Sequence, residues 1–184
     1  MWNEQIIMML LEGIKDTLYM TLTSTLIGYV IGLPMGILLT VTDKDGIHPN
    51  TAVYKVLDVI ANLIRSVPFL ILLIVLIPFT RFLIGRSYGP TATIVPLVIA
   101  AAPYIARMVE SSLKEVDAGV IEAARSMGAS NFTIVTKVML VEARTSLIVG
   151  ATISLGTILG YSAMAGTVGG GGLGDIAIRY GYTR

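Results

Sequence analysis

Residues 107–144 read RMVESSLKEVDAGVIEAARSMGASNFTIVTKVMLVEAR, a long polar stretch in a strongly apolar chain. The stretch holds five of the 13 Lys and Arg residues and five of the 12 carboxylates. So many charges are too costly to place in lipid, so this segment must face water between membrane spans. Its apolar residues recur at helical spacing. The sequence therefore predicts an all-α integral membrane protein with one large water-facing loop.

The composition supports this fold class. Apolar residues make up 54% of the 184 residues and charged residues 14%, whereas soluble domains carry about 25% charged residues. The net charge of +1 gives no electrostatic footprint for nucleic acid, so no nucleic-acid partner is expected. The chain has no cysteine and one histidine, His48, so we expect no thiolate site and no metal site.

Four apolar segments are long enough to cross a bilayer, which takes about 20 residues. The expected spans are residues 17–42, 56–79, 88–106 and 145–165. In the first span, Gly28, Gly32 and Gly36 should let a neighbouring helix approach closely. In the second span, Asp58, Asn62 and Arg65 should form a polar face that points to water or protein at the membrane edge.

The two flanking segments are read differently. Residues 1–16 are too short to span, so we expect either an interfacial helix with Trp2 near the headgroups or the start of the first span. Residues 166–174 hold six glycines in nine positions, and we do not expect a stable helix there.

The distribution of Lys and Arg predicts the orientation. With four spans, eight basic residues fall on one side: Lys44, Lys55, Arg65 and the five of loop 107–144. Five fall on the other: Lys15, Arg81, Arg86, Arg179 and Arg184. Because positive charge is enriched on the cytoplasmic side, the loop should be cytoplasmic and the N-terminal segment 1–16 external.

Within the loop, the pattern predicts two short helices joined by an elbow. Good helix formers at 122–125 are followed by Gly128, where a left-handed cap causes no Cβ clash. Ser130 can then cap a second helix, whose apolar side is formed by Ile134, Val135, Val138 and Met139. Before the elbow, Glu110 and Lys114 have the spacing of a helical ion pair. A small apolar elbow at a membrane surface suits the groove of a partner protein.

These residues carry a resemblance. Glu122-Ala123-Ala124, then Gly128 and, after nine intervening residues, Val138-Met139-Leu140 resemble the EAA loop of ATP-binding cassette (ABC) importer permeases. The alternative is an ordinary solvated loop. Further stretches resemble the methionine-importer branch of that family: 32–34 (GLP), 65–69 (RSVPF), 77–81 (IPFTR), 102–110 (APYIARMVE) and 160–166 (GYSAMAG).

The resemblance implies a type I ABC importer transmembrane domain over residues 17–184. The branch typically has five spans, whereas we count four. It implies two cytoplasmic ATPase subunits that bind ATP and Mg, and an external substrate-binding protein or lipoprotein. Because four or five spans are few for a pathway, we also expect a second copy of the chain. The residues implied in ATPase coupling are Glu122, Ala123, Ala124, Gly128, Ala129 and Ser130.

No catalytic or cofactor-binding site is expected in the chain itself. It has no G-x-x-x-x-G-K-[ST] motif, and its Gly-rich run ends at Asp175, an acid that would repel phosphate. ATP should therefore be hydrolysed on a partner.

The fourth span is the candidate for the transport path. Thr157, Tyr161 and Met164 follow at i, i+4 and i+7 beside Gly156 and Gly160. Such a face suits an apolar amino-acid side chain, because the flexible thioether of methionine adapts to irregular contacts. Plain helix packing explains the same pattern equally well. The functional hypothesis is an amino-acid importer, most readily for methionine; a permease for another amino acid and a non-transporting membrane scaffold are the alternatives.

Overall fold

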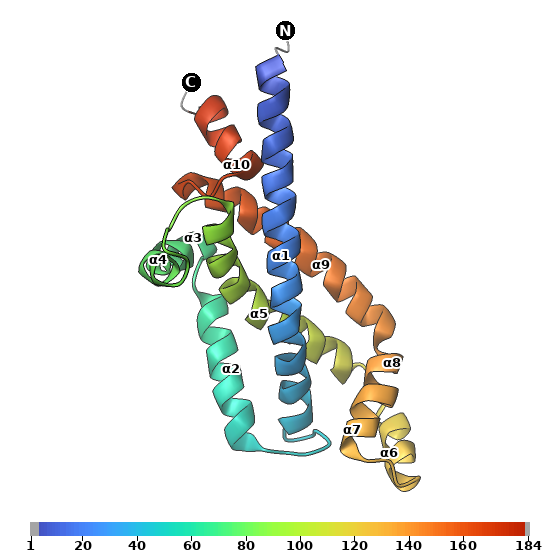
Figure 1. Cartoon of the computed structure of the whole chain (residues 1–184). Coiled ribbons are helices and arrows are strands. Elements are labelled where there is room, and N and C mark those ends of the chain that lie inside the picture. The colour runs from blue at the N-terminus through green and yellow to red at the C-terminus, as the bar shows by residue number, and fades with distance from the viewer. Residues whose placement is uncertain (1–3, 183–184) are drawn as a thin grey trace. The chain divides into compact units, whose positions relative to one another are not determined.

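The computed structural model describes residues 4–182, which contain helices and no strands (Figure 1). Trp2 and Arg184 lie outside the described residues. Three helices there are long and apolar enough to cross a membrane: α1 (Glu4–Thr42), α5 (Pro90–Lys114) and α9 (Arg144–Ala165). Counting the broken pair α2 (Thr51–Ser66) and α3 (Phe69–Val75) as one span makes four. The other elements are α4 (Ile77–Ile84), α6 (Ala118–Ser126), α7 (Asn131–Thr133), η1 (Ile134–Met139), α8 (Leu140–Glu142), η2 (Gly166–Val168), α10 (Gly172–Ala177) and η3 (Ile178–Tyr182).

Two helices extend beyond the expected spans. Residues 4–16 form the beginning of α1, which matches the second of the two alternatives for that segment. No proline interrupts this stretch, so the helix continues into the first span. Helix α5 runs past residue 106 to Lys114 because Val109 and Leu113, each 1% exposed, continue its buried stripe.

The segment expected as the second span, 56–79, is not one continuous helix. Helix α2 ends at Ser66, and Pro68 stands at the N-cap of α3 with an extended backbone (φ −54°, ψ 135°). Proline lacks an N–H donor and disfavours helical geometry in the residue before it, so the helix cannot continue through this point. Pro78 lies in the first turn of α4, where proline is tolerated.

The chain divides into two compact units. The described residues of unit 1 are 4–28, 66–101 and 155–182, and those of unit 2 are 29–65 and 102–154. Helices α1, α5 and α9 each contribute a segment to both units.

In unit 1, the Gly-rich segment brings α10 back beside the N-terminal part of α1 (Figure 1). The N–H of Leu173 donates to Thr17 Oγ1 at 2.9 Å, and the N–H of Gly89 donates to the carbonyl of Gly169 at the same distance. The expectation of no helix at 166–174 is wrong for Gly172 and Gly174, which lie in α10. The bonds to α1 and to the chain before α5 stabilise this short helix despite its glycines.

In unit 2, the C-terminal part of α1 packs closely on α5. A Cβ on Gly36 would lie 2.5 Å from the carbonyl oxygen of Ala106 and 2.6 Å from Cβ of Val109. Only glycine allows this approach, which confirms the close packing expected of Gly36.

Candidate functional site

The predicted elbow is present in unit 2 and begins with α6. Asp117 caps this helix by accepting a hydrogen bond from the N–H of Gly119 at 2.8 Å. Gly128 follows α6 with φ +81°, a conformation that side-chain-bearing residues rarely adopt. The N–H of Ala129 donates to the carbonyl of Ala124 at 3.1 Å. The left-handed turn at Gly128 therefore ends the first helix, as the sequence predicts.

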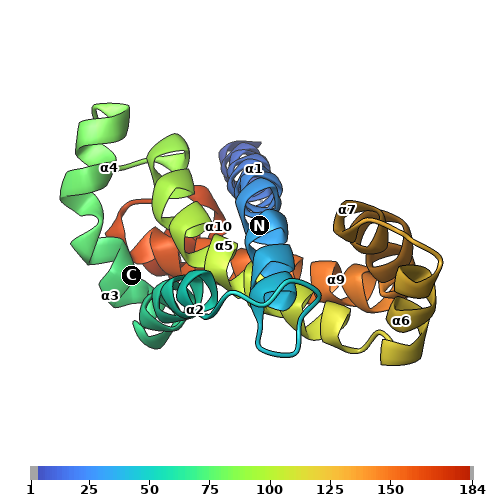
Figure 2. The ribbon, with the colours of Figure 1, turned by 90° about the horizontal axis from the view of Figure 1, so that it is seen from below.

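The second half of the elbow starts at Ser130. Its hydroxyl accepts a hydrogen bond from the N–H of Thr133 at 3.2 Å, which confirms the predicted N-cap. The helix continues through α7, the π-helical segment η1 and α8. Ile134 and Met139 are buried, and η1 packs against α6 (Figure 2). The two helices of the elbow therefore share a small apolar core.

The outer surface of the elbow carries two large apolar side chains. Met127 is 82% exposed and Phe132 is 78% exposed, on either side of the turn at Gly128. Among the sequence candidates, Glu122, Ala123 and Ser130 are exposed, Ala129 is half-buried and Ala124 is buried. Sequence reasoning missed Met127 and Phe132, although apolar residues flanking a predicted surface turn are the signal for such a patch.

A cleft separates α6 from the loop that joins α1 to α2. Its volume is about 700 Å³, and its lining includes Asp43, Lys114, Glu122 and Arg125. The guanidinium of Arg125 donates to the carbonyl of Ile47 at 2.8 Å. This hydrogen bond links the elbow to the loop at residues 43–50.

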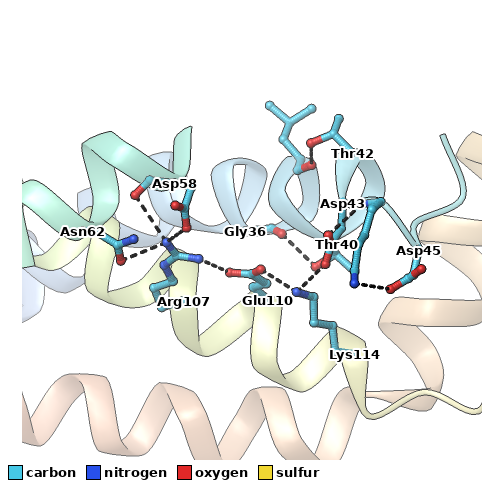
Figure 3. Close-up of polar contacts among 12 residues, drawn as sticks. Gly36, Thr40, Thr42, Asp43, Asp45, Asp58, Asn62, Arg107, Glu110 and Lys114 are labelled. Carbon is cyan, nitrogen blue, oxygen red and sulfur yellow. Dashed lines mark hydrogen bonds and ion pairs between the residues drawn. The ribbon is translucent and has the colours of Figure 1, made fainter. Parts of the chain in front are cut away.

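A chain of alternating charges joins α2, α5 and the end of α1 within unit 2 (Figure 3). Arg107 is its centre: the guanidinium contacts the carboxylate of Asp58 and donates to Glu110 at 2.7 Å and to the side-chain oxygen of Asn62 at 3.0 Å. Glu110 is 5% exposed, so its charge is compensated by partners rather than by water. The polar face predicted at Asp58 and Asn62 therefore contacts protein.

Lys114 completes this chain of alternating charges. Its ammonium lies 2.8 Å from Glu110, as the helical spacing predicts, and 2.7 Å from Asp43. The hydrogen bond from Lys114 holds the pKa of the Asp43 carboxyl below its ordinary value, against the opposing effect of burial. Within residues 4–182, no cluster of His, Asp or Glu has the arrangement of a metal site.

The three candidates for the transport path lie in unit 1, on α9. Ser162 on the same helix is 1% exposed and accepts a hydrogen bond from Thr21 at 3.4 Å, which fixes one face of α9 inward. Thr157 and Tyr161 are half-buried at the margin of that face, and Met164 is 46% exposed. The ring of Tyr161 stacks on Phe69, with ring centroids 4.5 Å apart and planes within 6°. Phe69 was not among the sequence candidates.

The chain is similar to known proteins of one family. Residues 8–183 match the family described as "Binding-protein-dependent transport system inner membrane component". A Vibrio cholerae protein called "Probable D-methionine transport system permease protein MetI" is 48% identical over 176 residues, which cover 96% of this chain and 78% of that protein. The Escherichia coli K12 "D-methionine transport system permease protein MetI" is 51% identical over 164 residues, covering 89% and 76%.

A solved structure is similar to this chain as well. It is described as "Inward facing conformations of the MetNI methionine ABC transporter", and it superposes with a TM-score of 0.97 and 50% identity over 99% of this chain and 84% of that one. The resemblance to ABC importer permeases and the type I importer fold expected from the sequence are thereby confirmed. With these relatives matched over nearly its whole length, the chain belongs to the family of binding-protein-dependent transport system inner membrane components.

Proposed function

We propose that the chain is the permease subunit of an ATP-driven importer that carries methionine across the inner membrane. The observation that carries this proposal is the 48–51% identity, over nearly the whole chain, to relatives named as D-methionine permeases. The chain is a transport subunit, and a partner ATPase binds ATP together with Mg and hydrolyses the ATP.

The elbow is the surface proposed for that ATPase. It presents Met127 and Phe132 to solvent around the rigid turn at Gly128, and apolar side chains of this kind anchor a short helix in a partner's groove. Two ATPase subunits would bind, one to each copy of a permease dimer. The loop 107–144 is then cytoplasmic, and an external substrate-binding protein or lipoprotein delivers the substrate from the opposite side.

The test is ATP-dependent uptake. The chain is purified with the ATPase that co-purifies with it and reconstituted in lipid vesicles together with the external substrate-binding protein. Uptake of labelled methionine is followed with and without ATP. Uptake that requires ATP and is competed by unlabelled methionine is expected. Stronger competition by another amino acid would identify that amino acid, instead of methionine, as the substrate. Absence of uptake both with and without ATP would favour a membrane scaffold.

A further inference from the structure

The break between α2 and α3 places one aromatic ring. Pro68 stops the preceding helix, and Phe69 is the first residue of α3. Although it lies next to the break between two helices, Phe69 is only 7% exposed. A continuous helix through this point would give residue 69 a different direction, so the break decides where its ring lies.

That ring packs against Tyr161 and not merely among aliphatic side chains. The centroids are 4.5 Å apart and the planes lie within 6° of each other, so a large part of one face of Tyr161 is covered. Two planar groups stacked in this way restrict each other's rotation about χ2. The orientation of the Tyr161 ring is therefore set by Phe69 as well as by its own helix.

Tyr161 stands between the buried and the open side of α9. Ile158, Ser162 and Ala165 form the buried side, each at most 1% exposed. Met164, three residues after Tyr161, is 46% exposed on the open side. Residues three apart on a helix are neighbours on its surface, so Met164 follows Tyr161 where α9 turns from its buried to its open side.

We infer that Phe69 is a specificity-determining residue of the transport path: it holds the ring of Tyr161 beside Met164, so that a thioether side chain is accepted over a hydrocarbon chain of equal length. This inference rests on the proposed function. Sulfur makes favourable contacts at the edge of an aromatic ring, about 5 Å from it, and a methylene group lacks the polarisability that strengthens them. The contact requires a ring held in one orientation, which the stack on Phe69 supplies.

The experiment compares methionine with norleucine, in which a methylene replaces the sulfur. The complete reconstituted complex takes up labelled methionine while unlabelled methionine or norleucine competes, and the ratio of the two half-inhibitory concentrations is measured. Any external binding protein is the same in every sample, so a change of ratio between variants reports on the permease. Phe69→Leu, which stays apolar but loses the ring, should lower the preference for methionine about two- to tenfold, the range of one sulfur–aromatic contact.

Two further variants separate orientation from packing. Phe69→Tyr keeps the stacked ring and should retain the wild-type ratio. Leu73→Val, one turn further along α3 at a position that is 4% exposed, perturbs packing on the same helix and leaves both rings of the stack unchanged. It should lower the yield of complex and leave the ratio unchanged.

Each outcome either supports or overturns the inference. Wild-type complex that does not take up methionine would remove the proposed function, and the inference with it. Wild-type uptake combined with an unchanged ratio in assembled Phe69→Leu would overturn the inference alone. Where Phe69→Leu does not assemble, Tyr161→Leu takes its place, because losing the other ring of the stack should lower the ratio by the same factor; an unchanged ratio there overturns the inference equally.

Discussion

The ammonium group of Lys114 lies 2.7 Å from the carboxylate of Asp43, so the last residue of α5 is bonded to the first residue after α1. Since this contact lowers the pKa of Asp43, the carboxylate stabilises the folded state above its unfolded pKa of about 3.9. That contribution is lost as the pH falls through the lower folded-state pKa.

The first prediction follows from that sign. Asp43→Asn should reduce the free energy of unfolding at pH 7 by about 0.5–1 kcal/mol, because Lys114 is partly solvated and the pair is screened. Below about pH 4 the difference between wild type and variant should shrink. Denaturant unfolding of the detergent-solubilised protein over a pH series measures both effects, and a difference that grows toward acid would contradict the assignment.

A second prediction concerns the centre of the charge chain. Arg107→Leu would leave Glu110 buried without one of its partners and Asp58 without its cation, at a cost of about 3–5 kcal/mol in the free energy of unfolding. The exposed Arg65 is the matched control, since Arg65→Leu should change stability by less than about 0.5 kcal/mol. Equal losses in the two variants would show that Arg107 does not hold α2 to α5.

The contrast between these two kinds of ion pair shows what the sequence can predict. The Glu110–Lys114 pair was predictable because residues four apart on a helix are neighbours whatever the fold. The Arg107–Asp58 pair joins positions 49 apart, and only the packing of α2 on α5 brings them together. The polar face at Asp58 was recognised, but its partner was not.

A third prediction concerns the elbow. Gly128→Val would strain a residue at φ +81° by about 1–2 kcal/mol and redirect the second helix, so ATPase binding or ATP-dependent uptake should fall while membrane insertion is unchanged. Gly128→Asn should retain more function, because asparagine tolerates left-handed geometry. Co-purification of the ATPase measures binding. A valine variant with wild-type yield of complex and wild-type uptake would remove Gly128 from the coupling site.

The fourth prediction is the orientation. The chain has no native cysteine, so single cysteines report cleanly. Ser126→Cys on the elbow should react with an impermeant thiol reagent only when the cytoplasmic side is open, and Ser87→Cys only from outside. Labelling of Ser126→Cys in intact cells would show that the topology is the opposite of the predicted one.

A fifth prediction addresses Met164. Because this side chain is 46% exposed, Met164→Ala should cost little stability, whereas Met20→Ala, fully buried in the same unit, should cost about 2–5 kcal/mol. If Met164 narrows the transport path, its alanine variant should change uptake or selectivity per assembled complex. Reduced yield with unchanged specific uptake would assign it to helix packing alone.

Local signals also explain why the elbow was predicted, whereas the helix break within the second span was not. Gly128 and Ser130 act on their own backbone, so their roles can be read without knowing the fold. At Pro68 the local signal was equally clear, but the apolar run around it has the length of a span and suggested one helix. Phe69 was missed for the same reason as Asp58's partner: its stack on Tyr161 depends on which helices are neighbours.

The hydrogen bond from Leu173 to Thr17 also bears on how the protein is made. The two residues are 156 positions apart, and at a synthesis rate of about 5–20 residues per second the ribosome needs roughly 8–30 s to make the chain between them. During that time Thr21, whose hydroxyl later bonds Ser162, also lacks its partner. The first helix must therefore remain in the bilayer, or with the insertion machinery, as an incomplete unit until the Gly-rich segment has emerged.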